Sequence, residues 1–382
     1  MRDMVEIGMG RTARRTYELD DITIVPSRRT RSSKDVSTAW QLDAYRFEIP
    51  VASHSTDAVV SPEFAIELGR LGGLGVLNGE GLIGRHADVE AKMAQVVEVA
   101  AKEPEAPHGS KAAIRLLQHL HSAPLDRDLL GAAVTRVREA GVTTAVRVSP
   151  QNVQALTPTL VAAGIDLLVI QGTIISAERV ASDGEPLNLK TFISELDMPV
   201  VVGGVLDHRT ALHLMRTGAA GVIVGYGSTT GATTSDEVLG ISVPMATAIA
   251  DAAAARREYL DETGGRYVHV LADGDITTSG DLAKAIACGA DAVMLGPPLA
   301  AAAEAPGQGW FWPAAAAHPS LPRGAVLQIA TGERPSLQQV LNGPSDDPFG
   351  SLNLVGALRR SMAKAGYCDL KEFQKVGLTV GS

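Results

Sequence analysis

Short apolar runs alternate with stretches of helical periodicity along most of the chain, and this alternation limits the possible folds more than any other feature. Eight runs have the length and β-branched character of buried parallel strands: 49–53, 73–77, 144–148, 167–170, 200–203, 222–225, 268–272 and 292–296. The amphipathic stretches between them include 65–71, 89–101, 152–163, 209–217, 243–255 and 279–288. Eight strand–helix repeats fit a closed (β/α)₈ barrel better than an open doubly wound sheet. We therefore predict an α/β fold, a TIM barrel forming a single domain over residues 1–382.

Residues at the predicted helix ends agree with this division. Asp207 and Ser279 precede helical stretches and are predicted N-caps, because their side-chain oxygens can accept from free backbone N–H groups. Gly164, Gly218 and Gly289 follow helices, where a positive φ is common.

Three segments lie outside the regular repeat. Residues 1–48 form an N-terminal arm, and 345–382 form a C-terminal segment. The gap 78–142 has helical content (89–101, 111–121 and 128–140), so we predict helices packed on the barrel rather than a separate domain. The stretch 307–344 is rich in Pro, Ala and Trp and is predicted to be a flap or lid region. Trp310 and Trp312 either line a pocket there or pack in the core.

Composition restricts the partners. The formal net charge of −9 argues against nucleic-acid binding. A local arginine cluster is either a phosphate contact or a solvated or subunit-contacting surface, and its members are Arg11, Arg14, Arg15, Arg28, Arg29 and Arg31. Two cysteines provide no disulfide framework. No apolar run spans a bilayer and no secretory core follows Met1, so we expect a cytoplasmic protein without a membrane partner.

The run 222–225 leads into the clearest candidate site. It is followed by a stretch rich in Gly, Ser and Thr, in the order strand, polar loop, helix that α/β folds use for sites. Small side chains let the backbone approach a ligand, and hydroxyls supply hydrogen bonds. The residues of interest are Gly225, Gly227, Ser228, Thr233 and Thr234.

Motifs in consistent order resemble the IMP dehydrogenase and GMP reductase family over nearly the whole chain. They are 17–26 (YELDDITIVP), Ile49-Pro50 with Asp57, 72–77 (GGLGVL), Ala272-Asp273-Gly274, 293–296 (VMLG), 304–307 (EAPG) and 354–359 (LVGALR). The chain resembles most the short paralogues of this family that lack the regulatory CBS insertion. The gap 78–142, which is too short to hold that insertion, agrees with this resemblance.

The resemblance implies a reaction that this chain has altered. In the family a loop cysteine attacks the purine, NAD takes the hydride, and an Arg–Tyr pair on a mobile flap activates water. Thr233 stands at the cysteine position, and a threonine hydroxyl needs a strong base that is not visible nearby. Cys288 lies inside a predicted helix before Gly289 and Cys368 lies near the C-terminus, so neither replaces it. The Arg–Tyr pair is not recognisable in 307–344.

Other positions of the family's site are also changed. The resemblance assigns substrate binding to Ser53, His54, Thr56, Asp273, Gly274, Asp275, Gly296 and Pro297, and cofactor binding to Gln171 and Gly204. Pro297 and Pro298 remove a phosphate-binding serine and two N–H donors. Asp275 replaces a glycine and places a carboxylate near the phosphate position, where repulsion costs on the order of one to a few kcal/mol at about 4 Å.

Three interpretations remain open. The first is a regulatory or ligand-binding pseudoenzyme linked to purine metabolism and GMP biosynthesis, associating with a purine nucleotide or an active IMP dehydrogenase paralogue. The second is an active NAD(P)-dependent oxidoreductase on IMP or GMP, using His54, Asp57, Thr233 and Thr234. The third is an enzyme with another substrate, with His54 and Asp275 at predicted carboxyl ends of strands. His269 is more consistent with core packing.

The expected cofactor depends on whether the chain is active, and the expected assembly follows from the family resemblance. We expect NAD only if the chain is active, no metal site, and, by resemblance, a homo-tetramer.

Overall fold

The computed structural model describes residues 4–103, 109–172, 187–228, 236–320 and 323–381. Its centre is an eight-stranded parallel sheet in the order β6-β13-β12-β11-β10-β9-β8-β7. A parallel bridge between Ala52 and Leu74 joins β6 to the segment before β7 and closes the barrel. The strands are β6 (Val51–Ser53), β7 (Val76–Asn78), β8 (Ala145–Val148), β9 (Leu167–Gln171), β10 (Val200–Val205), β11 (Gly221–Val224), β12 (His269–Ala272) and β13 (Ala292–Leu295).

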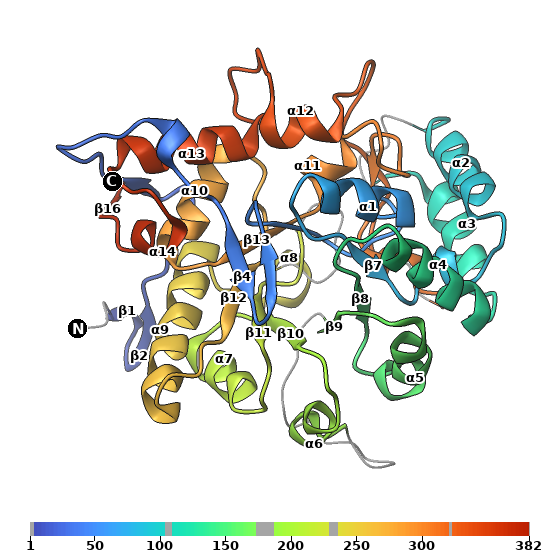
Figure 1. Ribbon diagram of the computed structural model, residues 1–382, viewed down its shortest axis with the longest axis horizontal. Coiled ribbons are helices and arrows are strands. Elements are labelled where there is room, and N and C mark those ends of the chain that lie inside the picture. Colours follow the sequence, from blue (N-terminus) through green and yellow to red (C-terminus); the bar gives the residue numbers. More distant parts are fainter. Residues whose placement is uncertain (1–3, 104–108, 173–186, 229–235, 321–322, 382) are drawn as a thin grey trace.

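Helices surround the strands (Figure 1). They are α1 (Pro62–Arg70), α2 (Val89–Ala100), α3 (Lys111–His121), α4 (Arg127–Glu139), α5 (Val153–Ala163), α6 (Leu189–Ser194), α7 (His208–Met215), α8 (Asp236–Leu239), α9 (Met245–Thr263), α10 (Ser279–Cys288), α11 (Pro297–Ala300), α12 (Leu337–Asn342), α13 (Leu354–Lys364) and α14 (Leu370–Phe373). Three 3-10 helices are η1 (Ser33–Asp35), η2 (Leu82–Gly84) and η3 (Ala314–Ala317). The predicted (β/α)₈ barrel is confirmed, and each of the eight predicted strands overlaps a barrel strand.

The ends of two helices illustrate where the structure differs from the prediction. The helix predicted at 243–255 begins at Met245 and continues to Thr263, because its alanine-rich middle and polar end favour helix until Gly264 takes a positive φ of 66°. Ser279 is not an N-cap but the first helical residue. Thr278 caps α10 instead, because Asp281 three positions later completes a capping box with it.

Both chain ends pack on the same side of the barrel (Figure 1). β16 (Leu378–Val380) pairs with β3 (Ile22–Ile24), and α13 packs against α10. The remaining short strands form three antiparallel pairs: β1 (Met4–Gly8) with β2 (Arg11–Arg14), β4 (Trp40–Leu42) with β5 (Tyr45–Phe47), and β14 (Trp310–Phe311) with β15 (Leu327–Gln328).

The stretch 307–344 contributes to the core. Trp310 is 3% exposed and Trp312 is 0% exposed. Of the two interpretations of these tryptophans, core packing agrees with the structure.

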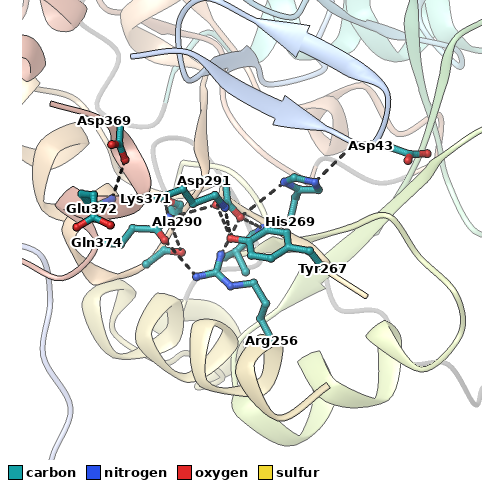
Figure 2. Close-up of polar contacts among 12 residues, drawn as sticks. Asp43, Arg256, Tyr267, His269, Ala290, Asp291, Asp369, Lys371, Glu372 and Gln374 are labelled. Atoms are coloured by element: carbon teal, nitrogen blue, oxygen red, sulfur yellow. Dashed lines mark hydrogen bonds and ion pairs between the residues drawn. The ribbon is translucent and has the colours of Figure 1, made fainter. Parts of the chain in front are cut away.

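A buried charge cluster lies at the amino-terminal end of the barrel strands (Figure 2). Asp291 precedes β13, is 2% exposed, and accepts hydrogen bonds from Arg256 at 2.7 Å and Lys371 at 2.6 Å. Tyr267 donates to it at 2.8 Å. Burial alone would raise the pKa of Asp291, but the interactions with Arg256, Lys371 and His269 outweigh that effect. The net result is a pKa lowered to about 2. The cluster holds α9, β12 and α14 together on the face opposite the candidate site.

Candidate functional site

A buried histidine–aspartate pair occupies the carboxyl end of the barrel. His54 follows β6 and Asp273 follows β12, so both emerge at the edge where parallel-strand barrels place their sites. His54 Nδ1 lies 3.1 and 3.0 Å from the two oxygens of Asp273. Gln171, at the end of β9, donates from Nε2 to Asp273 Oδ2 at 2.6 Å. His54 is 7% exposed, Asp273 is 1% exposed and Gln171 is 4% exposed. The carboxylate of Asp273 is therefore enclosed by the protein's own hydrogen-bond donors.

The glycines of the candidate loop pack directly on this pair. Gly227 has φ +100°, and a Cβ there would lie 2.7 Å from His54 Cε1. Gly225 has φ +90°, and its Cβ would lie 2.1 Å from the carbonyl oxygen of Asp273. The N–H of Gly227 donates to that same oxygen at 3.0 Å. Both glycines are therefore required by backbone conformation and close approach.

A cationic group enters the barrel mouth from β8. Arg147 donates to the backbone oxygen of Gln171 at 2.8 Å and lies 3.6 Å from Glu80. Burial lowers the pKa of Arg147, and the carboxylates of Glu80, Asp273 and Asp57 partly oppose that effect. Glu80 also accepts from the hydroxyl of Ser149 at 3.0 Å. The mouth thus holds a connected set of charges beyond the predicted residues.

Asp57 belongs to a second pair and does not join His54. Its Oδ2 lies 3.0 Å from His121 Nε2, and its Oδ1 accepts from the N–H of Leu82 at 3.1 Å. Asp57 and His121 are 6% and 7% exposed, which leaves Asp57 bound within the fold.

Two more predicted residues make structural contacts. Ser53 Oγ accepts from the N–H of Val76 at 2.8 Å, and Thr56 Oγ1 donates to the carbonyl of Trp312 at 2.7 Å. Ser53 and Thr56 are both 0% exposed.

The segment after β13 departs from a phosphate cradle. α11 begins with Pro297 and Pro298, neither of which has a backbone N–H. Phe311 packs beside Gly296, since a Cβ on that glycine would lie 3.1 Å from the ring. Phe311 is 1% exposed, so an aromatic core residue lies at this turn.

A pocket of about 550 Å³ opens beside the buried pair, between the ends of β11 and β12 and the N-terminal arm. Gly274 and Asp275 line it, and Asp275 accepts from the hydroxyl of Ser228 at 2.7 Å. Its charged lining residues are Glu18, Asp20, Asp273, Asp275, Asp281 and Lys284. The Asp273 carboxylate is enclosed, and the other four carboxylates with one ammonium make this pocket unfavourable for a dianion.

The predicted site residues therefore divide into groups. His54, Asp273 and Gln171 come together, as do Ser228 and Asp275. Gly204 lies within β10 and is buried. Thr233 and Thr234 lie outside the described residues.

Sequence reasoning missed Arg147, Glu80 and Phe311. Arg147 had a usable signal, because a charged residue interrupts an otherwise apolar parallel strand. Phe311 had none, since its neighbour Gly296 is fifteen positions away and the contact depends on tertiary packing.

Within the described ranges, no group of three or more His, Cys, Asp or Glu side chains could hold a metal ion. No helix in the part of the chain that the structure describes has the length and apolar character to cross a bilayer.

This architecture defines a class: a closed eight-stranded α/β barrel with a polar cluster at the carboxyl ends of its strands. The model of the IMP dehydrogenase / GMP reductase domain matches residues 16–319. The chain therefore belongs to the IMP dehydrogenase/GMP reductase family, and the family predicted from the motifs is confirmed.

Relatives of three kinds are similar to the chain. A protein named "uncharacterized oxidoreductase" from Mycolicibacterium smegmatis is 90% identical over 379 residues, covering 99% of this chain and 100% of its own. An inosine-5'-monophosphate dehydrogenase from Methanocaldococcus jannaschii is 26% identical, covering 78% of this chain and 74% of its own. The crystal structure of an IMP dehydrogenase/GMP reductase-like protein from Corynebacterium glutamicum has a TM-score of 0.92 at 58% identity, covering 99% of this chain and 98% of its own.

Proposed function

We propose that this protein is a regulatory or ligand-binding pseudoenzyme of the family, linked to purine nucleotide metabolism and GMP biosynthesis but without the cysteine-based dehydrogenase reaction. One observation carries the proposal. Asp273 stands at the position that the family resemblance assigns to ribose binding, yet His54 and Gln171 occupy its oxygens and leave it 1% exposed. A ribose would have to displace a hydrogen bond that His54 or Gln171 makes to this carboxylate. A hydrogen bond to a charged group is worth about 1.5–3 kcal/mol.

The phosphate position supports the same conclusion. The turn after β13 has no N–H at Pro297 or Pro298, and Phe311 packs against Gly296. Asp275 lines the neighbouring pocket with a carboxylate, which opposes a phosphate dianion. Loss of ribose, phosphate and thiol partners together argues against a nucleotide held as in the dehydrogenases.

Among the described residues, the position that the resemblance assigns to NAD binding fits this cofactor poorly. Gln171, at the position assigned to the nicotinamide side, turns its amide toward Asp273 and is 4% exposed. We therefore assign no reaction step to NAD, and a bound cofactor remains a feature of the alternative below.

A direct assay tests the proposal. Purified protein is given IMP with NAD, and separately GMP with NADPH, while NADH formation or NADPH consumption is followed by absorbance. Calorimetry with IMP, GMP, NAD and NADP measures binding in parallel. We expect flat absorbance traces; turnover of either nucleotide pair contradicts the proposal. A pull-down with the active IMP dehydrogenase paralogue then measures the expected association. If the protein binds neither a nucleotide nor the paralogue, that result also contradicts the proposal.

A second candidate function is an active oxidoreductase on purine nucleotides with a rearranged loop. The His54–Asp273 pair favours it, because a carboxylate that orients an imidazole is a common general-base arrangement. Under this alternative His54→Asn abolishes turnover of IMP or GMP, and NAD or NADP binds. A homo-tetramer and a cytoplasmic location remain predictions under either function.

A further inference from the structure

Two segments from opposite ends of the chain pack against each other and carry six basic residues, here called the basic surface: Arg28, Arg29, Arg31, Lys34, Arg360 and Lys364. All six are exposed. The first four belong to the segment around η1, and the other two belong to α13. Figure 1 shows the N-terminal segment lying along α13 at the upper left.

Backbone contacts fix the two segments against each other. The N–H of Ser27 donates to the carbonyl of Lys364 at 3.3 Å, and the N–H of Arg31 donates to Ala363 at 2.9 Å. Arg31 Nε also donates to the carbonyl of Gly366 at 2.7 Å. The loop that carries Arg28 and Arg29 is thus anchored on both sides at the last turn of α13, which concentrates positive charge there.

These charges are not neutralised within the part of the chain that the structure describes. None of the six makes an ion pair with a described carboxylate, whereas surface pairs elsewhere include Arg136–Glu63 and Lys102–Glu98. Asp35 is the single acidic residue within 27–36 and 359–366. In a chain of net charge −9 this is a strong local reversal of sign.

Helix stabilisation accounts for part of the pattern. Lys364 lies in the last turn of α13, where a cation complements the helix dipole. Arg28 and Arg29 are adjacent on the loop, and neither forms an ion pair with a carboxylate of the described residues that would offset their mutual repulsion. An external anion removes that mutual repulsion.

We propose that the basic surface binds an acidic segment of a partner protein, through Asp and Glu carboxylates. Four of the six side chains are arginines, whose planar guanidinium group can donate two parallel hydrogen bonds to one carboxylate. A short acidic segment lies within about one Debye length of the surface, roughly 10 Å at 0.1 M salt, and is shielded from the rest of the acidic protein.

Nucleic acid fits this surface less well. A long polyanion extends over the remaining, negatively charged protein and is repelled by it. Single-stranded nucleic acid also needs aromatic platforms for its bases. Phe349 is exposed but lies five residues before the first residue of α13, whereas Lys364 lies about 15 Å along the helix axis from Leu354. Tyr367, which follows Lys364 by three residues, is half-buried.

The test uses the full chain and a fluorescent oligoglutamate peptide, with anisotropy as the readout. Wild-type protein is expected to bind at low salt and to lose affinity as salt is raised. Arg28→Glu with Arg360→Glu is expected to weaken binding about tenfold or more. The matched control is Arg115→Glu with Arg257→Glu, which changes net charge equally on α3 and α9 and keeps wild-type affinity.

A milder variant pair and competing ligands separate this proposal from the alternatives. The milder pair Arg28→Gln with Arg360→Gln, checked for native circular dichroism, replaces the reversed pair should the latter misfold. Three results overturn the proposal: no salt-sensitive binding of oligoglutamate, equal loss in the control pair, or tighter binding of oligothymidylate or heparin than of oligoglutamate. Dissociation of an oligomer by the paired substitution also overturns it, because the basic surface would then be a contact between copies of this chain.

Discussion

His54 Nδ1 lies 3.0 Å from Asp273 Oδ2 across the mouth of the barrel, although the two residues are 219 positions apart in the chain. β13 separates their parent strands, so the contact depends on the pairing of β13 with both β6 and β12. The carboxylate that the family resemblance assigns to a substrate is here an internal hydrogen-bond acceptor. Under the proposed function, a residue type that the family resemblance assigns to substrate binding instead accepts hydrogen bonds from its neighbours in the fold.

Restoring the nucleophile should not restore the family reaction. Thr233→Cys supplies the thiol, but Asp273 remains enclosed and the turn at Pro297 still lacks N–H donors. We expect no NADH from IMP and NAD, measured by absorbance. Because Cys368 is already exposed, the control for access to the new cysteine is labelling by a thiol-specific dye in excess of that of the wild-type protein. NADH formation by this variant would show that the nucleotide site is intact.

Close approach at Gly227 should make that glycine sensitive to substitution. In Gly227→Ala the new methyl would lie 2.7 Å from His54 Cε1 at φ +100°. Backbone strain of about 1–2 kcal/mol adds to the clash, so we expect a loss of about 2–4 kcal/mol in the free energy of unfolding. Urea denaturation measures it. Gly264→Ala, at φ +66° with open space around it, isolates the strain; equal losses in both variants would argue against the close packing on His54.

Periodicity was sufficient to predict the barrel but not the contacts within its mouth. Each strand carries its own signal, because an apolar run such as 222–225 is buried on both faces whatever its neighbours are. Asp273 also carries a motif, and its position after a strand could be predicted. Its partner Gln171 lies on a strand three places away in the barrel, and a single sequence contains no signal for pairs at that separation. Phe311 and Gly296 illustrate the same limit.

The charge cluster around Asp291 should be a major contributor to stability. Asp291→Asn leaves Arg256, whose side chain is 7% exposed, without its anionic partner at 2.7 Å. Removing one partner of a buried pair costs about 3–5 kcal/mol, which urea denaturation measures. Glu98→Gln, which breaks the exposed pair with Lys102, is the control and should leave stability unchanged. Similar values for the two variants would mean that the cluster adds little.

His269 should make the stability of the protein depend on pH. Its side chain is 12% exposed beside Asp291. Burial lowers the pKa of His269 to about 4; Asp291 and Asp43 oppose this effect, and Lys371 and Arg256 reinforce it. The unfolded chain takes up a proton at this residue below about pH 6.5, whereas the folded chain does so only below about pH 4.

The sign of the effect follows from that difference. Because the unfolded state binds more protons, the free energy of unfolding should fall as pH decreases from about 6.5 to about 4, by about 3 kcal/mol for this group. His269→Gln keeps an acceptor for the N–H of Asp43 and removes the titration. Urea denaturation of both proteins over this range gives the contribution of His269 as the difference in slope, since the carboxylates titrate in both. Parallel stability curves would mean that the imidazole is protonated as easily in the folded protein as in the unfolded chain.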